Sequence, residues 1–193
     1  MDAYILAIGA ELLLGSVTDT NTAFLAQQLS AAGAKVAGTG IVGDNPDELV
    51  AAVRHALSLA DVVLTTGGLG PTRDDLTRDA LMQIFGGELY LDETTTANVE
   101  RVMASRGRQM NKLTALQAMV PTSATVIQNP VGTAPILWFE ADGKVVVAMP
   151  GVPFELREVF VSEVLPRLKK RFQTEELHHA YLQTANIAES AVA

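Results

Sequence analysis

The fold is decided by a buried run that leads directly into glycines, Asp61-Val62-Val63-Leu64-Thr65 and then Thr66-Gly67-Gly68-Leu69-Gly70. A short, continuous apolar run that ends at glycine is typical of a strand buried on both faces, as in parallel sheets. Two earlier stretches, residues 4–9 and 35–42, also read as strands. We therefore predict that these three strands belong to one parallel sheet.

Helical patterns separate the three strands. Asp19 and Asn45 are candidate N-caps, and Pro46 suits the first position of a helix. Behind each cap, apolar side chains recur at helical spacing over residues 24–32 and 49–57. The order strand, helix, strand, helix, strand with short links predicts right-handed crossovers between parallel strands.

The second half of the chain adds a different kind of strand pairing. We predict helices over 78–85, 92–107 and 111–119 and a brief strand at 126–127. Residues 135–140 and 144–149 flank Asp142-Gly143, which is a strong signal for a two-residue hairpin. A final helix begins near Pro153, and Pro166 should kink or end it. The fold class is therefore α/β, with a mostly parallel sheet that carries an antiparallel edge.

Composition and charge limit the function classes. The chain has 193 residues, of which 48% are hydrophobic and 19% charged, as in ordinary globular proteins. The formal net charge of −8 argues against binding to nucleic acid or to an anionic membrane, because both need a basic face. The high hydrophobic content beside so little charge leads us to expect a homo-oligomer.

The absence of cysteine excludes disulfides, thiolate zinc sites and cysteine nucleophiles. No apolar stretch is long enough to cross a membrane, and the N-terminus has no basic region of the kind that signal peptides have. We expect a cytoplasmic protein.

The glycine-rich stretch after the third strand is the first candidate site. Gly67, Gly68 and Gly70 let the backbone approach a ligand and turn its N–H groups outward, and the next helix adds a positive N-terminus. Together these features predict a phosphate site. The pattern is neither a P-loop nor a dinucleotide fingerprint, because it lacks the required lysine and third glycine. The alternative is a glycine-rich turn that only precedes a helix. Thr72 and Thr77 either donate to the same anion or cap locally.

Asp74 and Asp75 follow this loop, and two carboxylates there repel a phosphate unless a cation intervenes. Mg²⁺ takes oxygen ligands and usually bridges phosphate to one or two carboxylates. We therefore expect a divalent metal at one of the pair, whereas the other has an easy explanation as a helix cap.

Three more polar loops should lie at the same sheet edge, because ligands bind outside the carboxyl ends of parallel strands. The first contains Glu11 and leads to Asp19 and Asn21. The others contain, in chain order, Asn129, Gly132 and Thr133, and then Pro150 and Gly151. Glu155, which follows the last of these loops, is either a partner of the helix dipole or a site carboxylate.

Four motifs also carry a family resemblance, namely residues 9–21, 65–77, 129–135 and 149–155. In this order and spacing they resemble the N-terminal module of the CinA (competence/damage-inducible) family. That module is similar to the molybdopterin-binding domains of molybdenum-cofactor biosynthesis. The similarity runs from about Tyr4 to Leu168, and Gly9-Ala10-Glu11 departs from it where a hydroxyl residue is common between the glycine and the glutamate.

The resemblance implies a three-layer α/β/α fold, often oligomeric, and a metal-dependent ADP-ribose pyrophosphatase that gives AMP and ribose 5-phosphate. It implies that the glycine loop grips phosphate and that Asp75 is essential. We expect Asp75 and Glu11 to be catalytic, and Asp75, Asp74 and Glu155 to be candidate ligands of Mg²⁺ or a similar ion. The alternative is a module that binds molybdopterin or a nucleotide phosphate without turnover.

The last residues resemble the opening of a linking domain that longer relatives have. We expect one domain over residues 1–170, and over 171–193 a tail or the truncated start of that linking domain. The deamidase activity of the longest relatives is not assigned to these residues.

Overall fold

The computed structural model describes residues 1–72, 74–173, 185 and 191. Its centre is a six-stranded sheet with the strand order β2-β1-β3-β8-β7-β6. The strands are β1 (Asp2–Ile8), β2 (Lys35–Val42), β3 (Val62–Thr66), β6 (Ala124–Ile127), β7 (Ile136–Ala141) and β8 (Lys144–Met149). The first three strands and β8 are parallel, whereas β7 is antiparallel to both of its neighbours. The mostly parallel sheet with an antiparallel edge is confirmed.

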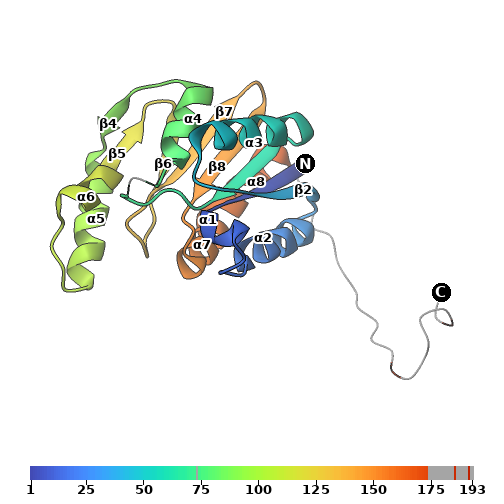
Figure 1. The fold of residues 1–193 in the computed structure, drawn as a ribbon, viewed down its shortest axis with the longest axis horizontal. Coiled ribbons are helices and arrows are strands. Elements are labelled where there is room, and N and C mark those ends of the chain that lie inside the picture. The colour runs from blue at the N-terminus through green and yellow to red at the C-terminus, as the bar shows by residue number, and fades with distance from the viewer. Residues whose placement is uncertain (73, 174–184, 186–190, 192–193) are drawn as a thin grey trace.

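Helices cover both faces of this sheet (Figure 1). The helices are α1 (Ala10–Leu13), α2 (Thr20–Ala31), α3 (Pro46–Leu59), α4 (Thr77–Phe85), α5 (Glu93–Ser105), α6 (Lys112–Ala115), α7 (Pro153–Val159) and α8 (Leu165–Phe172). One apolar core joins the sheet to α2, α7 and α8, and the other joins it to α3 and α4. The three-layer α/β/α arrangement is confirmed.

Strand β8 shows why the sheet has two cores. Val145, Val147 and Met149 belong to the core beneath α2 and α7, whereas Val146 and Ala148 belong to the core beneath α3 and α4. Successive side chains of a strand point to opposite faces, so a strand covered on both sides is apolar at every position. All five of these side chains are 0% exposed.

The local signals for helices and turns hold in the structure. Asp19 accepts a hydrogen bond from the backbone N–H of Thr22 at 2.9 Å and so caps α2, and Asn45 caps α3. Asp142 and Gly143 adopt φ values of 52° and 78°, which are the positive values that a type I′ hairpin turn requires. That turn joins β7 to β8, as the sequence predicts.

A second, smaller sheet was not predicted from the sequence. It has two strands, β4 (Leu89–Leu91) and β5 (Met119–Pro121), and it lies with α5 and α6 beside β6 (Figure 1). Each of these strands has three residues, which is too short to show an alternating pattern. The helix predicted over 111–119 is accordingly shorter, because α6 is followed by the 3₁₀ segment η1 (Leu116–Ala118) and then by β5.

Pro166 does not end the last helix, which continues to Phe172. Before the proline, η2 (Phe160–Val164) is π-helical, and Pro166 stands in the first turn of α8. A π turn removes the regular hydrogen-bond ladder at the place where proline lacks its N–H, so the helix tolerates the ring. Leu168 of α8 is 0% exposed, and Phe172 packs against the same core.

Two sequence-based expectations concern residues outside the described ones. The first is that the adjacent histidines His178 and His179 are surface residues and not metal ligands. The second is the linking domain, which rests on residues 181–192, nearly all of them outside the described part of the chain. Within the part of the chain that the structure describes, no helix has both the length and the apolar character that a membrane span needs. The homo-oligomer and the domain boundary near residue 170 stay predictions.

Candidate functional site

The four predicted loops meet at one hollow of about 600 Å³, which we call the main hollow. It is lined by Gly9 and Glu11 after β1, by Gly67, Gly68 and Gly70 after β3, by Thr133 after β6, and by Pro150 and Gly151 after β8. Strands β1, β3 and β8 are parallel, and β6 runs the same way because both β6 and β8 are antiparallel to β7. Their carboxyl ends therefore open on the same edge of the sheet, as predicted.

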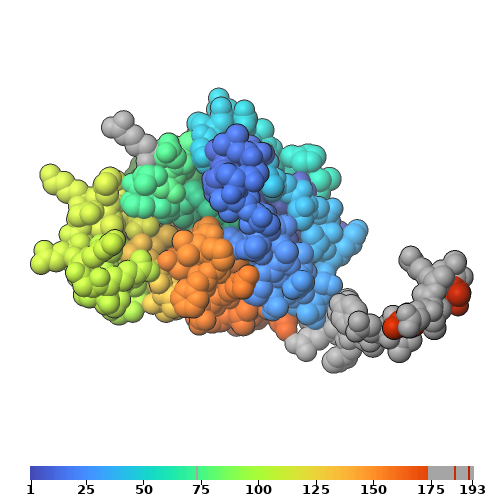
Figure 2. All heavy atoms as spheres, turned by 60° about the horizontal axis from the view of Figure 1, so that its bottom comes forward, coloured from blue at the N-terminus to red at the C-terminus, as the bar shows by residue number. Residues whose placement is uncertain are grey.

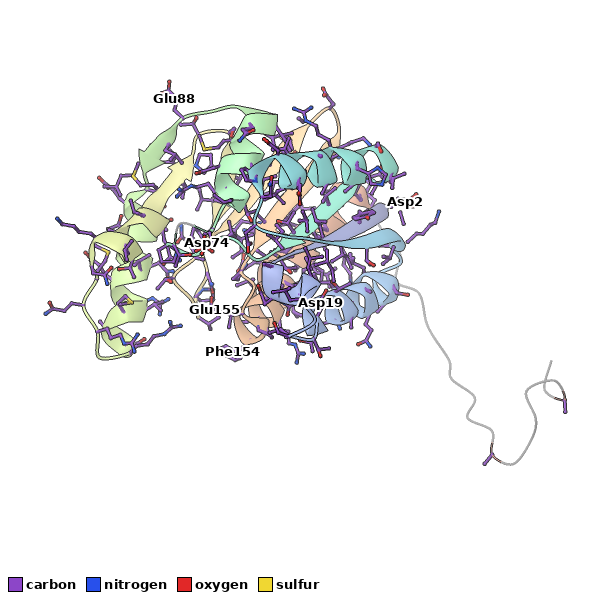
Figure 3. The ribbon with its side chains drawn as sticks, in the orientation of Figure 1. Asp2, Asp19, Asp74, Glu88, Phe154 and Glu155 are labelled. Atoms are coloured by element: carbon purple, nitrogen blue, oxygen red, sulfur yellow. The ribbon has the colours of Figure 1, made fainter. Side chains whose placement is uncertain are left out.

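Figure 2 shows N-terminal residues in blue beside orange residues that follow β8. Figure 3 labels Asp74 and Glu155, which both lie at the site edge of the sheet, whereas Asp2 and Glu88 lie away from it. Asp74 reaches the main hollow from the segment between Gly70 and α4, and Glu155 reaches it from the first turn of α7. The hollow has the size of a small-molecule site.

Two glycines of the glycine loop, residues 67–70, cannot be replaced without strain. Gly67 and Gly68 have φ values of 101° and 66°, in the region that favours glycine. A Cβ on Gly67 would strike the carbonyl oxygen of Ile8, and a Cβ on Gly68 would strike the hydroxyl of Thr77. The loop is therefore packed closely against β1 and against the start of α4.

Thr77 anchors this loop from within. Its hydroxyl donates a hydrogen bond to the carbonyl of Gly67 at 2.8 Å, and its backbone N–H donates to the carbonyl of Gly68 at 3.1 Å. The residue is 0% exposed. Of the two roles that the sequence left open for Thr77, the structure supports the local one, because the hydroxyl proton is already used.

Asp75 holds the other end of the loop. One carboxylate oxygen accepts from the backbone N–H of Gly70 at 2.7 Å, and the other accepts from the backbone N–H and the hydroxyl of Thr72 at 2.8 and 2.6 Å. The N-cap position of α4 is Leu76, and no side chain caps it. The expectation that one aspartate of the pair caps this helix is therefore wrong. Asp75 instead caps a turn inside the loop.

These contacts decide which N–H groups of the loop are still available to a ligand. The N–H of Gly67 donates to the carbonyl of Met149 at 3.0 Å, and that of Gly70 donates to Asp75. The N–H groups of Gly68 and Leu69 donate to no other described residue, and both residues line the main hollow. Two N–H groups of this loop therefore remain without an acceptor among the described residues and are available to an anion.

The first loop contributes a carboxylate and a buried amide. Glu11 is exposed and lines the main hollow as well as a neighbouring hollow of about 100 Å³. Asn21 is 8% exposed and donates from its amide to the carbonyl of Gly151 at 2.8 Å, so it ties α2 to the loop after β8. Asp19 lines only the smaller hollow, where its carboxylate is already used as the cap of α2.

Asn129 organises the third loop and does not face the hollow. The residue is 0% exposed, and its oxygen accepts from the N–H groups of Val131 and Gly132 at 3.1 and 2.9 Å. Its amide nitrogen donates to the carbonyl of Ala134 at 3.1 Å and to Glu155 at 3.0 Å. Because each of these polar atoms has two partners, we assign Asn129 a structural role in place of the ligand contact that the sequence suggested.

Glu155 is held between an amide and a guanidinium. Its side chain is 12% exposed, and its second oxygen lies 3.5 Å from Nη2 of Arg106. Arg106 also donates to the carbonyl of Val131 at 3.1 Å. The carboxylate therefore joins the third loop to α7, and Arg106 brings a positive charge to the main hollow.

Three lining residues were missed by sequence reasoning: Asp44, Arg106 and Gln117. Asp44 stands next to the N-cap of α3, and its carboxylate accepts from the N–H of Ala10 at 3.2 Å. Arg106 ends α5, and Gln117 lies in η1. Arg106 and Gln117 do not follow a strand of the main sheet, so loop position gave no signal for them. Asp44 stands two residues after β2, which is parallel to β1, so the sheet-edge argument could have found it.

The predicted metal ligands are not gathered into one cluster. Among the described residues, no group of three or more His, Cys, Asp and Glu side chains is placed to hold a metal ion. Asp74, Asp75 and Glu155 nevertheless line the same hollow.

Residues 4–170 match the family model described as "Probable molybdopterin binding domain". The chain belongs to this family. The resemblance to the CinA N-terminal module is confirmed by relatives. The chain is 43% identical over its whole length to a CinA-like protein of Gemmatimonas aurantiaca, and 38% identical over 99% of its length to one of Cytophaga hutchinsonii. In both cases the match covers 46% of the relative, so the chain spans about half the length of these curated relatives.

Solved structures agree with this placement. The CinA protein of Thermoplasma acidophilum is 34% identical, with a TM-score of 0.77 over 86% of this chain and 96% of that one. MoaB of Pyrococcus furiosus, a tungsten cofactor synthesising protein, has a TM-score of 0.57 over 88% of this chain and 96% of that one. At 23% identity it shows the shared fold alone. The molybdopterin-binding fold of this CinA-like chain is thus established.

Proposed function

We propose that the chain binds ADP-ribose in the main hollow and hydrolyses its pyrophosphate bond, with a divalent cation, to AMP and ribose 5-phosphate. The observation that carries the proposal is the meeting of a phosphate-type glycine loop with several carboxylates in one hollow of about 600 Å³. The identity of the substrate comes from the family resemblance, and the need for a cation comes from the charges.

The negative charge of the residues that line the main hollow explains why a cation is needed. Five carboxylates line the main hollow, those of Glu11, Asp44, Asp74, Asp75 and Glu155, whereas Arg106 is the lone basic residue among the described lining residues. A pyrophosphate brought against this wall is repelled unless a cation accompanies it. Oxygen donors suit Mg²⁺, which is commonly held by one or two carboxylates plus phosphate oxygens, so a three-carboxylate cluster is not required.

Asp74 is the residue that would hold such a cation, and Glu11 stays available as a base. Both are exposed at the hollow, and neither carboxylate accepts a hydrogen bond from another described residue. A bound divalent cation would supply neutralisation of phosphoryl charge and activation of water. Asp75 retains some acceptor capacity, since a carboxylate has about four lone-pair sites and three donors contact this one.

The chain's own residues then have distinct tasks. The free N–H groups of Gly68 and Leu69 bind a phosphoryl group and stabilise the charge that develops on it. Asp75 positions these groups by fixing the loop at Gly70 and Thr72. Glu11 accepts the proton of the attacking water, because it is the exposed carboxylate that reaches both neighbouring hollows.

The test is a turnover assay in which ADP-ribose is incubated with the chain, with and without Mg²⁺ or Mn²⁺, and AMP is quantified. We expect release of AMP only with the metal, and a loss of rate of about 100-fold or more in Glu11→Gln. Glu88→Gln is the matched control, because Glu88 lies away from the hollow (Figure 3). A metal-independent rate, or a wild-type rate in Glu11→Gln, contradicts the proposal.

A second candidate is a module that binds molybdopterin or a nucleotide phosphate without turnover. It is favoured by one observation: Asp75, the expected catalytic carboxylate, already accepts three hydrogen bonds from its own loop. Tight binding of molybdopterin or ADP-ribose in calorimetry, with no product under any metal condition, would support this module.

A further inference from the structure

Gln117 carries an unused acceptor at the edge of the site. The residue lies in η1, is 6% exposed, and its side-chain oxygen is buried without a hydrogen-bond partner among the described residues. Buried polar side-chain atoms nearly always have a partner, so an exception at a ligand hollow points to a partner supplied by the ligand.

The residue stands between two spaces. Gln117 lines the main hollow and also a side slot of about 20 Å³, and Gly68, Leu69 and Gly70 line both spaces as well. The other walls of the slot are mostly apolar and include Met119 and Leu137, together with the charged side chains of Asp75 and Arg78. Both charged groups already have partners, Asp75 in its own loop and Arg78 at two backbone carbonyls. A space of this size accommodates about one water molecule or one amino group, but no ring. A ring would therefore lie in the main hollow and direct one small polar group into the slot.

Gln117 is fixed relative to the phosphate loop. Nη1 of Arg78 donates to the carbonyls of Leu116 and Met119 at 3.2 and 3.1 Å, on both sides of Gln117 in the chain. Arg78 belongs to the first turn of α4, the helix that follows the glycine loop. One guanidinium thus connects the element that positions the loop to the segment that carries the amide.

We propose that Gln117 determines which ring the site accepts, by taking a hydrogen bond from an exocyclic amino group of the ligand's heterocycle. The inference rests on the proposed function, because it places the phosphates at the glycine loop and the ring beside it. Largely apolar walls with one unpartnered acceptor suit the flat face and lone amino group of a heterocycle, whereas a sugar presents several hydroxyls. Adenine and pterin rings both have this chemistry.

Calorimetry with two matched ligand pairs tests the inference. The first pair is ADP-ribose and its analogue with unsubstituted purine in place of adenine. The second is 6-hydroxymethylpterin and 6-hydroxymethyllumazine, in which an oxo group replaces the amine. Each is titrated with Mg²⁺ into the chain that carries Glu11→Gln, and the variants below are made in the same background, so that turnover is suppressed and binding is measured alone. We expect the amino member of one pair to bind about 10-fold more tightly or better, because the other member leaves a buried acceptor unpaired.

Two variants connect the preference to the residue. Gln117→Met keeps the size of the side chain and removes the acceptor, and should lower the preference to below about 2-fold at an unchanged melting temperature. Gln128→Met is the matched control, because Gln128 also has a buried, unpartnered oxygen but lines neither the main hollow nor the slot. Its preference should equal that of the unchanged chain.

The outcomes separate the two proposals. Equal affinity of the unchanged chain for the two members of every pair that binds overturns the role of Gln117 and leaves the proposed function intact. If the preference for the amino member of a pair survives in Gln117→Met, the role of Gln117 is overturned as well. Binding of the pterin pair alone, with preference for the amine, supports Gln117 and contradicts ADP-ribose as the substrate. If no ligand binds, both proposals fail.

Discussion

Asp75 binds Thr72 through two hydrogen bonds, from the backbone N–H at 2.8 Å and from the hydroxyl at 2.6 Å. The same carboxylate accepts from the backbone N–H of Gly70, so it fixes the loop that carries the two available N–H groups. An aspartate that acts in this way is a positioning residue. Its replacement should change ligand affinity and loop stability together, which a purely chemical role would not do.

Asp75→Asn is therefore expected to weaken phosphate-ligand binding about 10-fold and to lower the free energy of unfolding by about 1 kcal/mol, because the amide nitrogen faces donors. Thr72→Val removes one of the three hydrogen bonds and should shift both quantities in the same direction by less. Calorimetry and urea unfolding measure the two effects. An Asp75→Asn variant with normal affinity and stability but no turnover, beside a normal Thr72→Val, would show instead that Asp75 acts directly on the reaction.

A pair of glycine substitutions separates backbone strain from close packing. Gly68 and Gly15 have similar φ values of 66° and 69°, but a Cβ on Gly15 meets nothing within 4 Å, whereas one on Gly68 strikes Thr77. Gly15→Ala should lower the free energy of unfolding by about 1 kcal/mol and leave ligand binding unchanged. Gly68→Ala should lower it by more than about 2 kcal/mol and abolish phosphate-ligand binding. Equal losses of stability in the two variants would disprove the packing argument.

Arg106 should matter for an anionic ligand. Arg106→Gln removes the positive charge that lies 3.5 Å from Glu155 and faces the main hollow. We expect affinity for ADP-ribose to fall about 3- to 10-fold at low salt, and the difference from the unchanged chain to shrink as salt is raised. Arg101→Gln is the control, since Arg101 lies on the same helix and donates to Pro130 without lining the hollow. A salt-independent effect, or the same effect in the control, would contradict this role.

The sequence predicts the sheet and the meeting of the loops because both follow from local patterns. Buried runs such as 62–66 define the strands, and parallel pairing then places their carboxyl ends together. The sequence does not predict which polar atoms already have hydrogen-bond partners within the protein. Thr77 and Asn129 have ligand-binding chemistry, but tertiary contacts direct them into their own loops. Gln117 shows the converse case, because its segment carries no motif.

The last prediction concerns the pairing of Asn129 with Glu155, 3.0 Å apart and at the base of the third loop. Asn129→Asp replaces the amide nitrogen with a carboxyl oxygen, so the hydrogen bonds that Asn129 donates to Ala134 and Glu155 are lost. The new carboxylate then lies beside the negative charge of Glu155. Burial and the neighbouring carboxylate both raise the pKa of the introduced group in the folded state. A raised folded-state pKa means that stability is lost as pH rises, so the variant should be less destabilised at about pH 5 than at about pH 8. Urea unfolding at the two pH values measures this difference.

Adding Glu155→Gln to the Asn129→Asp variant supplies an amide donor, and should restore part of the stability and remove most of its pH dependence. If the single variant is equally unstable at both pH values and the second substitution gives no recovery, the two residues are not coupled in the way that the geometry indicates.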